Sequence, residues 1–317
     1  MSDLGNPLDW IWAEKYRPRL IDDVILPESI KNKFRSMVKT REVPHLLLSG
    51  HRGTGKTTIA LAMVSEMGSD AIVINGSLDG NIDTLRTKIQ EFASAMSLVG
   101  GRKFVILDEA DYLNPNSVMP ALRNFMETHS RNCGFILTCN HRNKIIPELY
   151  SRLYEVAFRV DKKDAPKFAS KFMKRVETIL REEEVQYDPP VLGAVILRHY
   201  PDFRKVLNEL QGYSSDNGKI DSGILGSIRD VSIEDLVENL KKKNYTEVRK
   251  WVSANADDEA GVYRKLYDSA TELVDSASIP VLVLVLGKYQ HYSAFSVDPE
   301  VNLSAALAEI MVEVTWK

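Results

Sequence analysis

Several features that would place a protein in a specialised class are scarce in this sequence. Only two cysteines, Cys133 and Cys139, occur among the 317 residues, which excludes a framework of several disulfides and a zinc site with four cysteine ligands. Both lie in or beside an apolar run, so we expect buried, unreactive thiols. Apolar runs such as 281–286 are far too short to span a bilayer. The first residues lack the basic and apolar regions of a signal peptide, so we expect a reducing cytoplasm.

An excess of positive charge is also missing. The net charge is −3 and the isoelectric point is about 6.1, so no overall basic character indicates nucleic-acid binding. Any contact with DNA would have to come from a local patch, from helix N-termini or from the assembly of several chains. Hydrophobic residues make up 44% of the chain, which is enough for a sizeable core.

A phosphate-binding loop is the most informative feature that is present. Residues 50–57 read G-H-R-G-T-G-K-T, a complete G-x-x-x-x-G-K-T motif between a strand-like run and a helix-like run. Its glycines let backbone N–H groups close around phosphate oxygens, while Lys56 can reach the β- and γ-phosphates and Thr57 can hold Mg²⁺. The motif therefore predicts a site for a nucleoside triphosphate. The residues that we expect to bind it here are Gly53, Thr54, Gly55, Lys56, Thr57 and Thr58.

Two carboxylates follow a second apolar run. Residues 104–107 are strand-like, and Asp108 and Glu109 come directly after them. At the end of such a strand, Asp108 is placed to enter the Mg²⁺ shell, and Glu109 is placed to orient or deprotonate the attacking water. Two surface acids after a strand are the plain alternative, but their combination with a phosphate loop favours phosphoryl transfer.

Three further polar residues have less specific patterns. Asn140 ends another buried run, where its amide can hydrogen-bond the γ-phosphate or the water, or can simply cap the next turn. Arg152 and Arg204 are isolated arginines, and spacing alone does not distinguish them from solvated surface charges.

Apolar runs alternate with amphipathic segments in the first half of the chain. We expect buried parallel strands over residues 46–48, 71–74, 104–107 and 135–138. Between them, helical spacing predicts one helix over 81–96 and another that begins with Asn114 as its N-cap and Pro115 in its first position. This alternation predicts an α/β fold with a doubly wound parallel sheet and a ligand site at the C-terminal strand ends.

The second half of the chain is predicted to be helical. After about residue 160 the strand signals stop, and helices are expected over 162–181, 190–199 and 203–213, before a turn-forming patch at 214–218 and a short helix over 221–227. Helices are also expected over 233–240, 245–254, 260–274 and 301–314. The apolar run 279–286 fits either a strand or a buried helix, and its neighbours favour a helix. We therefore expect three domains: an α/β nucleotide-binding domain (1–160), a small helical domain (161–230) and an all-helical domain (231–317).

Together these motifs resemble those of the AAA+ ATPases, and within them the clamp-loader branch. The marks of the branch are E-K-Y-R-P at 14–18, D-E-x-D at 108–111 and the serine-arginine pair at 151–152. The phosphate loop, Asn140 and the phenylalanine-arginine pair at 203–204 complete the pattern. The resemblance implies a P-loop AAA+ domain followed by a small helical lid and an all-α collar domain that holds subunits together, with ATP and Mg²⁺ as cofactors.

The resemblance also implies roles for individual residues. The residues that would border the adenine side of the nucleotide are Glu14, Lys15, Tyr16, Arg17 and Ile25. Asn140 would be the first sensor of the phosphates, and Arg204, on the lid, would be the second sensor from the same chain. Arg152 would be a finger that reaches the ATP of the neighbouring subunit, so that hydrolysis is fast only when subunits pack correctly.

The implied function is that of an ATPase subunit of a sliding-clamp loader. Several copies of this chain and one non-identical subunit would form a pentameric spiral that opens a ring-shaped processivity clamp on ATP binding. The loader would place the clamp on primer–template DNA, and hydrolysis would release it, at replication forks. Candidates for weak DNA contacts are Asn81, Arg86, Lys88 and Asn116. A solvated helix face is the alternative for Arg86 and Lys88.

Other functions stay open at this point. A branch-migration helicase or a replication initiator of the same superfamily usually carries a winged-helix DNA reader, whereas the last part of this chain shows no basic β-wing pattern. A subunit that binds ATP without turnover is a third possibility, against which the intact Lys56, Glu109 and Arg152 argue. The chain also departs from the clamp-loader pattern, with Met119 where glutamine is typical and Leu153 where many members have cysteine.

Overall fold

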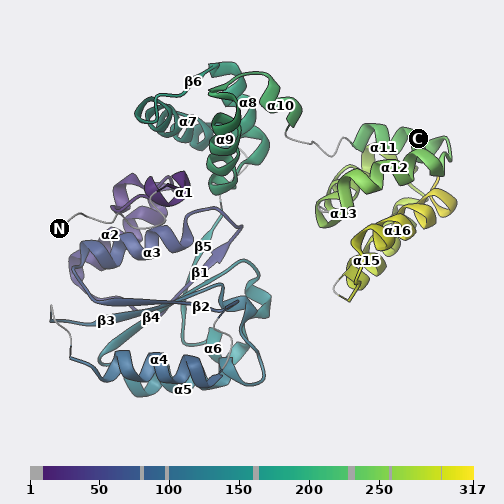
Figure 1. Cartoon of the computed structure of the whole chain (residues 1–317). Coiled ribbons are helices and arrows are strands. Elements are labelled where there is room, and N and C mark those ends of the chain that lie inside the picture. The colour runs from purple at the N-terminus through teal and green to yellow at the C-terminus, as the bar shows by residue number, and fades with distance from the viewer. Residues whose placement is uncertain are drawn as a thin grey trace. The chain divides into compact units, whose positions relative to one another are not determined.

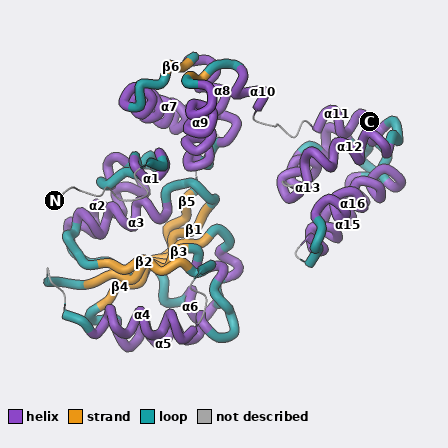
Figure 2. The backbone as a smooth tube through the Cα atoms, viewed as in Figure 1, coloured by secondary structure: helices purple, strands orange, loops and turns teal. Residues whose placement is uncertain are grey.

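The computed structural model describes residues 10–78, 82–96, 100–159, 164–227, 233–256, 259–293 and 295–317 (Figure 1). The chain divides into two compact units, Met1–Ser227 and Ile228–Lys317. Figure 2 shows that a strand-rich centre with surrounding helices forms the first unit and that helices dominate the second. The finer division into domains 1–160, 161–230 and 231–317 stays a prediction.

A five-stranded parallel sheet lies at the centre of the first unit. Its strands are β1 (Leu46–Gly50), β2 (Ala71–Asn75), β3 (Lys103–Asp108), β4 (Cys133–Cys139) and β5 (Tyr154–Phe158). They lie in the order β2-β3-β4-β1-β5, and every neighbouring pair is parallel. Ser49 of β1 is aligned with Cys139 of β4. The phosphate loop after β1 and Asn140 after β4 therefore emerge side by side at one edge of the sheet, where open α/β sheets bind ligands.

Helices cover both faces of this sheet, which confirms the predicted α/β class. They are α2 (Glu28–Thr40), α3 (Lys56–Glu66), α4 (Ile82–Ser94), α5 (Val118–His129) and α6 (Pro147–Tyr150), with the short α1 (Trp12–Lys15) and the 3-10 turns η1 (Ile21–Asp23), η2 (Ala110–Tyr112) and η3 (Arg142–Lys144). Leu46 and Leu48 pack into the cluster that includes α2 and α3, whereas Leu47 packs into the cluster of α4 and α5. Figure 1 shows these helix pairs on opposite faces of the sheet, as the alternation of side chains along a strand requires.

Two expectations for this region need correction. The fifth strand, β5, was not predicted, because exposed and buried residues alternate along it and no continuous apolar run marks it. Helix α5 begins at Val118 rather than directly after Asn114. The side chain of Asn114 accepts the N–H groups of Asn116 and Ser117, so a capped turn precedes the helix.

The lid region of the first unit contains α7 (Ala165–Glu182), α8 (Pro189–His199), α9 (Phe203–Asn217) and α10 (Gly223–Ser227). Contrary to the prediction, it also has a two-stranded parallel sheet of β6 (Gln186–Tyr187) and β7 (Lys219–Ile220), whose strands are too short to leave an apolar pattern. The expected turn at 214–218 is wrong in part, because α9 continues to Asn217. Ser214 and Ser215 donate their hydroxyls to the carbonyl of Gln211 within the helix instead of ending it.

The second unit is a bundle of α11 (Ile233–Lys241), α12 (Tyr245–Asn255), α13 (Glu259–Asp268), α14 (Ala270–Leu273), α15 (Ile279–Ser293) and α16 (Pro299–Glu313). Their apolar faces meet in one core. The single helix predicted over 260–274 is wrong, because the helix ends at Asp268 and α14 follows as a separate turn. In the part of the chain that the structure describes, every helix is too short or too polar to cross a membrane.

Candidate nucleotide site

The phosphate-binding loop joins β1 to α3. Gly53 and Gly55 have φ angles of +71° and +87°, in the left-handed region that glycine adopts without strain. Gly55 caps the N-terminus of α3, where free backbone N–H groups favour anions. A Cβ added to Gly53 would lie 1.9 Å from Oδ1 of Asp202. The loop therefore has the backbone that phosphate binding needs, and it lies directly against the start of α9 in the lid.

The ammonium group of Lys56 lies inside this loop. Its Nζ donates to the carbonyl oxygens of Gly50 (2.9 Å) and His51 (2.8 Å) and to Oδ1 of Asn140 (2.9 Å). Burial lowers the pKa of Lys56, and the charge of Arg204 acts in the same direction. A poorly hydrated cation beside a helix N-terminus is well placed to bind phosphate oxygens.

A single hydroxyl group connects the carboxylate of Asp108 to the backbone of Glu109. Thr57 Oγ1 donates to Oδ1 of Asp108 at 2.6 Å, and Thr138 Oγ1 donates to the same oxygen at 2.5 Å. Thr138 Oγ1 also accepts the backbone N–H of Glu109 at 3.1 Å. Glu109 has φ of 55° and ψ of 44°, a left-handed conformation that is uncommon outside glycine and that collects at functional sites. Thr138 thus fixes the position of Asp108 and of the backbone that carries Glu109.

Asp111, the last residue of the D-E-x-D string, holds the segment that follows β4. Its Oδ2 accepts the N–H groups of Asn140 (3.3 Å) and His141 (3.1 Å), and its side chain is buried. The D-E-x-D string therefore holds the backbone of Asn140, while the side-chain oxygen of Asn140 accepts a hydrogen bond from Lys56 of the phosphate loop.

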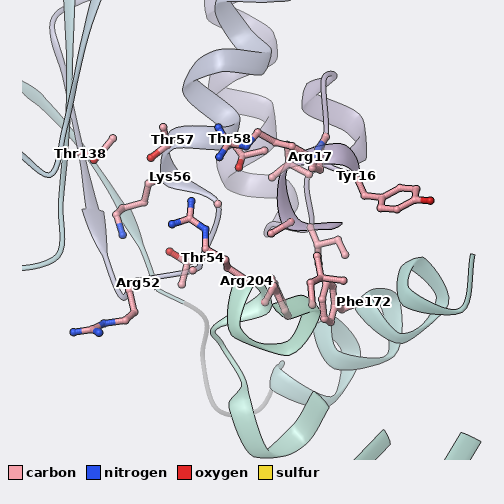
Figure 3. A pocket seen from close by; sticks show the side chains of 18 of the residues that line it. Tyr16, Arg17, Arg52, Thr54, Lys56, Thr57, Thr58, Thr138, Phe172 and Arg204 are labelled. Atoms are coloured by element: carbon pink, nitrogen blue, oxygen red, sulfur yellow. The ribbon is translucent and has the colours of Figure 1, made fainter. Parts of the chain in front are cut away.

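These elements surround one cleft of about 1100 Å³, counting its open mouth. Figure 3 shows side chains of the phosphate loop, the N-terminal segment and the lid around it. The predicted residues that line the cleft are Tyr16, Arg17, Ile25, Gly53, Thr54, Gly55, Lys56, Thr57, Thr58, Asp108, Glu109, Asn140 and Arg204. The fold thus brings together motifs that lie far apart in the sequence.

Two residues predicted for the adenine side, Glu14 and Lys15, are not among the residues that line the cleft. Glu14 pairs with Arg17 at 2.6 Å, and Lys15 pairs with Glu183 at the end of α7, also at 2.6 Å. The hydroxyl of Tyr16 donates to the same oxygen of Glu183 at 2.6 Å. In this structure Glu14 and Lys15 act on the cleft indirectly. Glu14 holds the lining residue Arg17, and Lys15 connects the N-terminal segment to the lid.

Sequence reasoning missed several residues that line the cleft. Phe172 and Arg175 come from α7, and Phe203 and Leu207 come from α9. The rings of Phe172 and Phe203 are stacked, with centroids 4.2 Å apart. The resemblance named Phe203 only as the neighbour of Arg204. No local motif marks the other positions, because amphipathic spacing predicts only a buried helix face. Thr138 left a signal, since it is a polar residue in an otherwise apolar strand end.

The two arginines lie in different places. Arg204 lines the cleft from α9, where its charge acts on Lys56. Arg152 follows α6 and is not among the lining residues. Its guanidinium contacts Glu127 at 2.6 Å and the carbonyl of Glu148 at 2.8 Å on the exposed surface. Within a single chain, Arg152 therefore does not reach the nucleotide site.

The DNA candidates are only partly covered by the structure. Arg86 is exposed on α4, Lys88 is half-buried there, and Asn116 is exposed in the turn before α5. Asn81 lies outside the described residues. Met119 is buried in the core beneath α5, so a thioether occupies the place of the polar side chain that is typical of the family.

Both cysteines are free and buried. Burial raises the pKa of Cys139 to about 12 and raises that of Cys133 as well. The prediction of buried thiols is therefore confirmed. A thiol that stays protonated is a poor nucleophile, and the expected lack of reactivity stays a prediction.

Two family models match the chain. The model described as ATPase family associated with various cellular activities (AAA) matches residues 46–161, and the model described as sliding-clamp-loader large subunit, AAA+ ATPase lid domain, matches residues 164–226. Among solved structures, the RuvB Holliday junction branch migration motor of Thermotoga maritima aligns with a TM-score of 0.51 at 17% identity, covering 67% of this chain and 71% of that chain. This likeness shows the fold alone.

Other relatives have a higher sequence identity to this chain. In this chain the segments 201–205 and 221–225 and the closing tryptophan and lysine resemble large subunits of T-even-type phage clamp loaders. The sliding-clamp-loader large subunit of Enterobacteria phage T4 is 33% identical over 98% of this chain and 99% of its own length, and that of Escherichia phage RB69 is 31% identical over the same shares. A replication factor C small subunit from Archaeoglobus fulgidus is 36% identical over 75% of this chain and 76% of its own length. The chain therefore belongs to the AAA+ ATPases, and within them to the family of sliding-clamp-loader large subunits.

Proposed function

We propose that this chain hydrolyses ATP at interfaces between its own copies in order to load a ring-shaped processivity clamp onto primer–template DNA. The family supports an ATPase that acts in clamp loading during DNA replication. ATP binding would close the assembly and open the clamp, and hydrolysis would release the clamp on DNA at the replication fork. The observation that carries the catalytic part is the separation of the two arginines, since Arg204 lines the cleft and Arg152 does not.

Within one chain, the residues around the cleft divide the work of phosphoryl transfer. Lys56 and Arg204 provide positive charge at the β- and γ-phosphates. Glu109, whose backbone is fixed through Thr138, orients or deprotonates the attacking water. Asn140 contacts Lys56 and is placed to reach the γ-phosphate or the water from the adjacent strand end.

The residues at the edge of the cleft fit Mg²⁺. The hydroxyl of Thr57 and the carboxylate of Asp108 meet at 2.6 Å, and both are the hard oxygen ligands that Mg²⁺ prefers, usually together with several waters. When bound, the ion would neutralise charge that develops on the phosphate oxygens. We therefore assign Thr57 and Asp108 as its protein contacts, partly through water.

Arg152 is suited to act on a neighbouring subunit. It is held by an ion pair with Glu127, in which the side chains are 36% and 51% exposed, and ion pairs of that kind contribute at most about 1 kcal/mol. The triphosphate bound by a neighbouring subunit would therefore replace Glu127 as the partner of Arg152 with little loss of free energy. An arginine finger supplied in trans is worth about 10³–10⁵ in rate, so turnover would depend on assembly.

The assembly that we propose contains several copies of this chain and one non-identical subunit in a pentamer, joined by their C-terminal helical domains and bound to the sliding clamp. Contacts with the DNA backbone would come from exposed groups such as Arg86 and Asn116 and from helix N-termini. This arrangement suits a chain with a net charge of −3, because each subunit contributes only a few contacts.

Mixed assemblies test the trans arrangement. Lys56→Ala chains and Arg152→Ala chains are each assembled with the partner subunit, clamp and primer–template DNA, and ATP turnover is measured alone and in mixtures. Each variant alone should be nearly inactive. Mixtures should regain part of the turnover, because Lys56→Ala chains still supply a finger to Arg152→Ala sites. Absence of rescue at every ratio would refute the trans role, and wild-type assemblies without turnover would favour a static, ATP-bound subunit.

A further inference from the structure

A carboxylate outside the nucleotide cleft joins three segments that the proposed function uses. Glu155, in the edge strand β5, accepts a hydrogen bond from Ser49 Oγ at 2.6 Å through Oε1 and one from the hydroxyl of Tyr150 through Oε2. The guanidinium of Arg142 lies 3.4 Å from Oε2 and 5.3 Å from the centroid of the Tyr150 ring. Glu155 itself does not line the cleft.

Two of its partners lead to the nucleotide site of the same chain. Ser49 directly precedes Gly50, the first residue of the phosphate loop, whose carbonyl accepts from Lys56. Arg142 lies two residues after Asn140, whose side chain also contacts Lys56. Glu155 therefore receives one contact from each of the two segments that hold this lysine.

The third partner leads to the finger. Tyr150 is the last residue of α6, and Arg152 follows after a single residue. The N–H of Arg152 donates to the carbonyl of Leu149 at 3.1 Å, so one tight turn connects the anchored tyrosine to the finger. A displacement of Tyr150 would consequently move the backbone of Arg152 as well.

The site is built to hold a charged carboxylate. The side chain of Glu155 is only 16% exposed, and burial alone would raise its pKa. Hydrogen bonds from Ser49 and Tyr150 and the charge of Arg142 outweigh burial and hold the pKa below its ordinary value. Hydrogen bonds to an ionised acceptor are shorter and stronger than neutral ones, so the four side chains form one firm junction.

We propose that Glu155 is a positioning residue that orients Arg152 toward the neighbouring subunit and ties it to the nucleotide site of its own chain. The inference rests on the proposed function, in which Arg152 acts in trans. A shift of the phosphate loop or of the Asn140 segment would reach Glu155 through Ser49 or Arg142 and would then move Tyr150 and the finger.

The test asks which chain of a composite interface needs Glu155. Assemblies with partner subunit, clamp and primer–template DNA are made in two arms. In the donor arm, Lys56→Ala/Glu155→Ala chains are mixed with Arg152→Ala chains, so the chain that supplies the finger lacks Glu155. In the acceptor arm, Lys56→Ala chains are mixed with Arg152→Ala/Glu155→Ala chains. Turnover should fall by up to about a hundredfold in the donor arm, since a misplacement of about 1 Å can cost that much, and much less in the acceptor arm.

Controls separate positioning from a general loss of structure. Glu155→Gln keeps the shape and one acceptor oxygen but not the charge, so it should restore part of the donor-arm turnover. Glu148→Ala, a like truncation on α6 whose backbone rather than side chain contacts Arg152, should leave both arms unchanged. Should Glu155→Ala chains fail to assemble, Tyr150→Phe removes only the hydroxyl and should give a smaller fall in the donor arm alone.

The outcomes are distinguishable. Equal losses in both arms, a loss confined to the acceptor arm, or no loss in either would overturn the positioning role while leaving the trans finger intact. Absence of rescue in the mixture that carries no Glu155 change would instead refute the trans finger, and this inference with it. A selective donor-arm loss that Glu155→Gln repairs in part would support it.

Discussion

The two ends of the nucleotide cleft are built in different ways. At the phosphate end, polar groups from the start of α3 and from the ends of β3 and β4 bond to one another, as in the contacts among Thr57, Asp108 and Thr138. At the other end, the N-terminal segment meets lid helices α7 and α9, and stacked rings such as Phe172 and Phe203 form the wall. Directional bonds thus position the groups that would do chemistry, while apolar packing shapes the wall that would hold the rest of the nucleotide.

This difference leads to a simple expectation. Substitutions at the phosphate end should lower the turnover number and leave ATP binding nearly intact, because they remove groups that act in the transition state. Substitutions at the lid end should weaken ATP binding and leave saturated turnover nearly unchanged. A variant at the phosphate end that mainly weakens ATP binding, or one at the lid end that mainly lowers turnover, would contradict this expectation.

The largest effect is expected for Glu109→Gln. The amide keeps the shape of the side chain but cannot accept the proton of the attacking water, so turnover should fall by about 10²–10⁴, the usual contribution of a general base. ATP affinity, measured by fluorescence titration, should change little. Turnover is measured in the complete assembly with clamp and DNA, with the exposed Glu42→Gln as control. Undiminished turnover would remove Glu109 from its role.

The phosphate end could be predicted because its residues lie inside short motifs with fixed spacing. Lys56, Asp108 and Glu109 follow from the phosphate loop and the acidic pair, since parallel strands deliver their C-terminal ends to one edge. Thr138 was missed, because its importance comes from a contact between β4 and β3 that no single segment reveals. Strand β5 was missed for a related reason, since its half-exposed pattern becomes a strand only through pairing with β1.

Thr138→Val should have the next largest effect. It removes the hydroxyl that donates to Asp108 and accepts from the N–H of Glu109, with almost no change of volume. Loss of such a supporting partner typically costs about 10- to 100-fold in activity or metal affinity, so turnover should fall within that range and should require more Mg²⁺ for saturation. The measurement is a Mg²⁺ titration of turnover.

Thr138→Ser is the matched control for that measurement, because serine keeps the hydroxyl and should retain most of the activity. Equal losses for valine and serine would indicate that packing rather than hydrogen bonding matters at this position. Unchanged turnover in Thr138→Val would show that the backbone of Glu109 keeps its left-handed conformation without the hydrogen bond to Thr138.

The lid end was predicted only in part. The resemblance implied Tyr16, Arg17, Ile25 and Arg204, but the other residues that line this end carry no local signature. Phe172 and Phe203 belong to amphipathic helices. Their pattern predicts a buried face but does not indicate which element packs against that face. The domain order was predicted from the loss of strand signals, whereas the docking of the lid depends on contacts between distant segments, such as those of Lys15 and Tyr16 with Glu183.

Phe172→Leu should have a moderate effect on ATP binding. Leucine keeps the buried site apolar but removes the stacked ring that faces the cleft, so ATP affinity should fall about three- to tenfold, as expected for loss of an aromatic contact. Turnover at saturating ATP should stay close to that of the wild type. Phe168→Leu, a buried phenylalanine of the same helix outside the cleft, is the control. A fall in saturated turnover without a change in affinity would break the division between the two ends.

The smallest effect is expected for Glu183→Gln, which weakens the tie between the N-terminal segment and the lid. Burial alone would raise the pKa of Glu183, but the hydrogen bonds from Lys15 and Tyr16 lower it. Burial, together with the bond to Glu183, raises the pKa of Tyr16 to about 12. The contribution of Glu183 is therefore lost only as the pH falls through its lowered pKa, and that of Tyr16 only as the pH rises toward 12.

Both groups consequently keep their bonding forms from about pH 6 to 9. Exposed ion pairs contribute little, so Glu183→Gln should weaken ATP binding by at most about threefold, and the difference from the wild type should be constant across this range. Titrations of ATP binding at several pH values measure it, with Glu182→Gln as a neighbouring control. A difference that grows between pH 6 and 9 would mean that another titrating group holds the lid. A loss larger than that of Phe172→Leu would mean that polar ties, and not stacked rings, shape this end of the cleft.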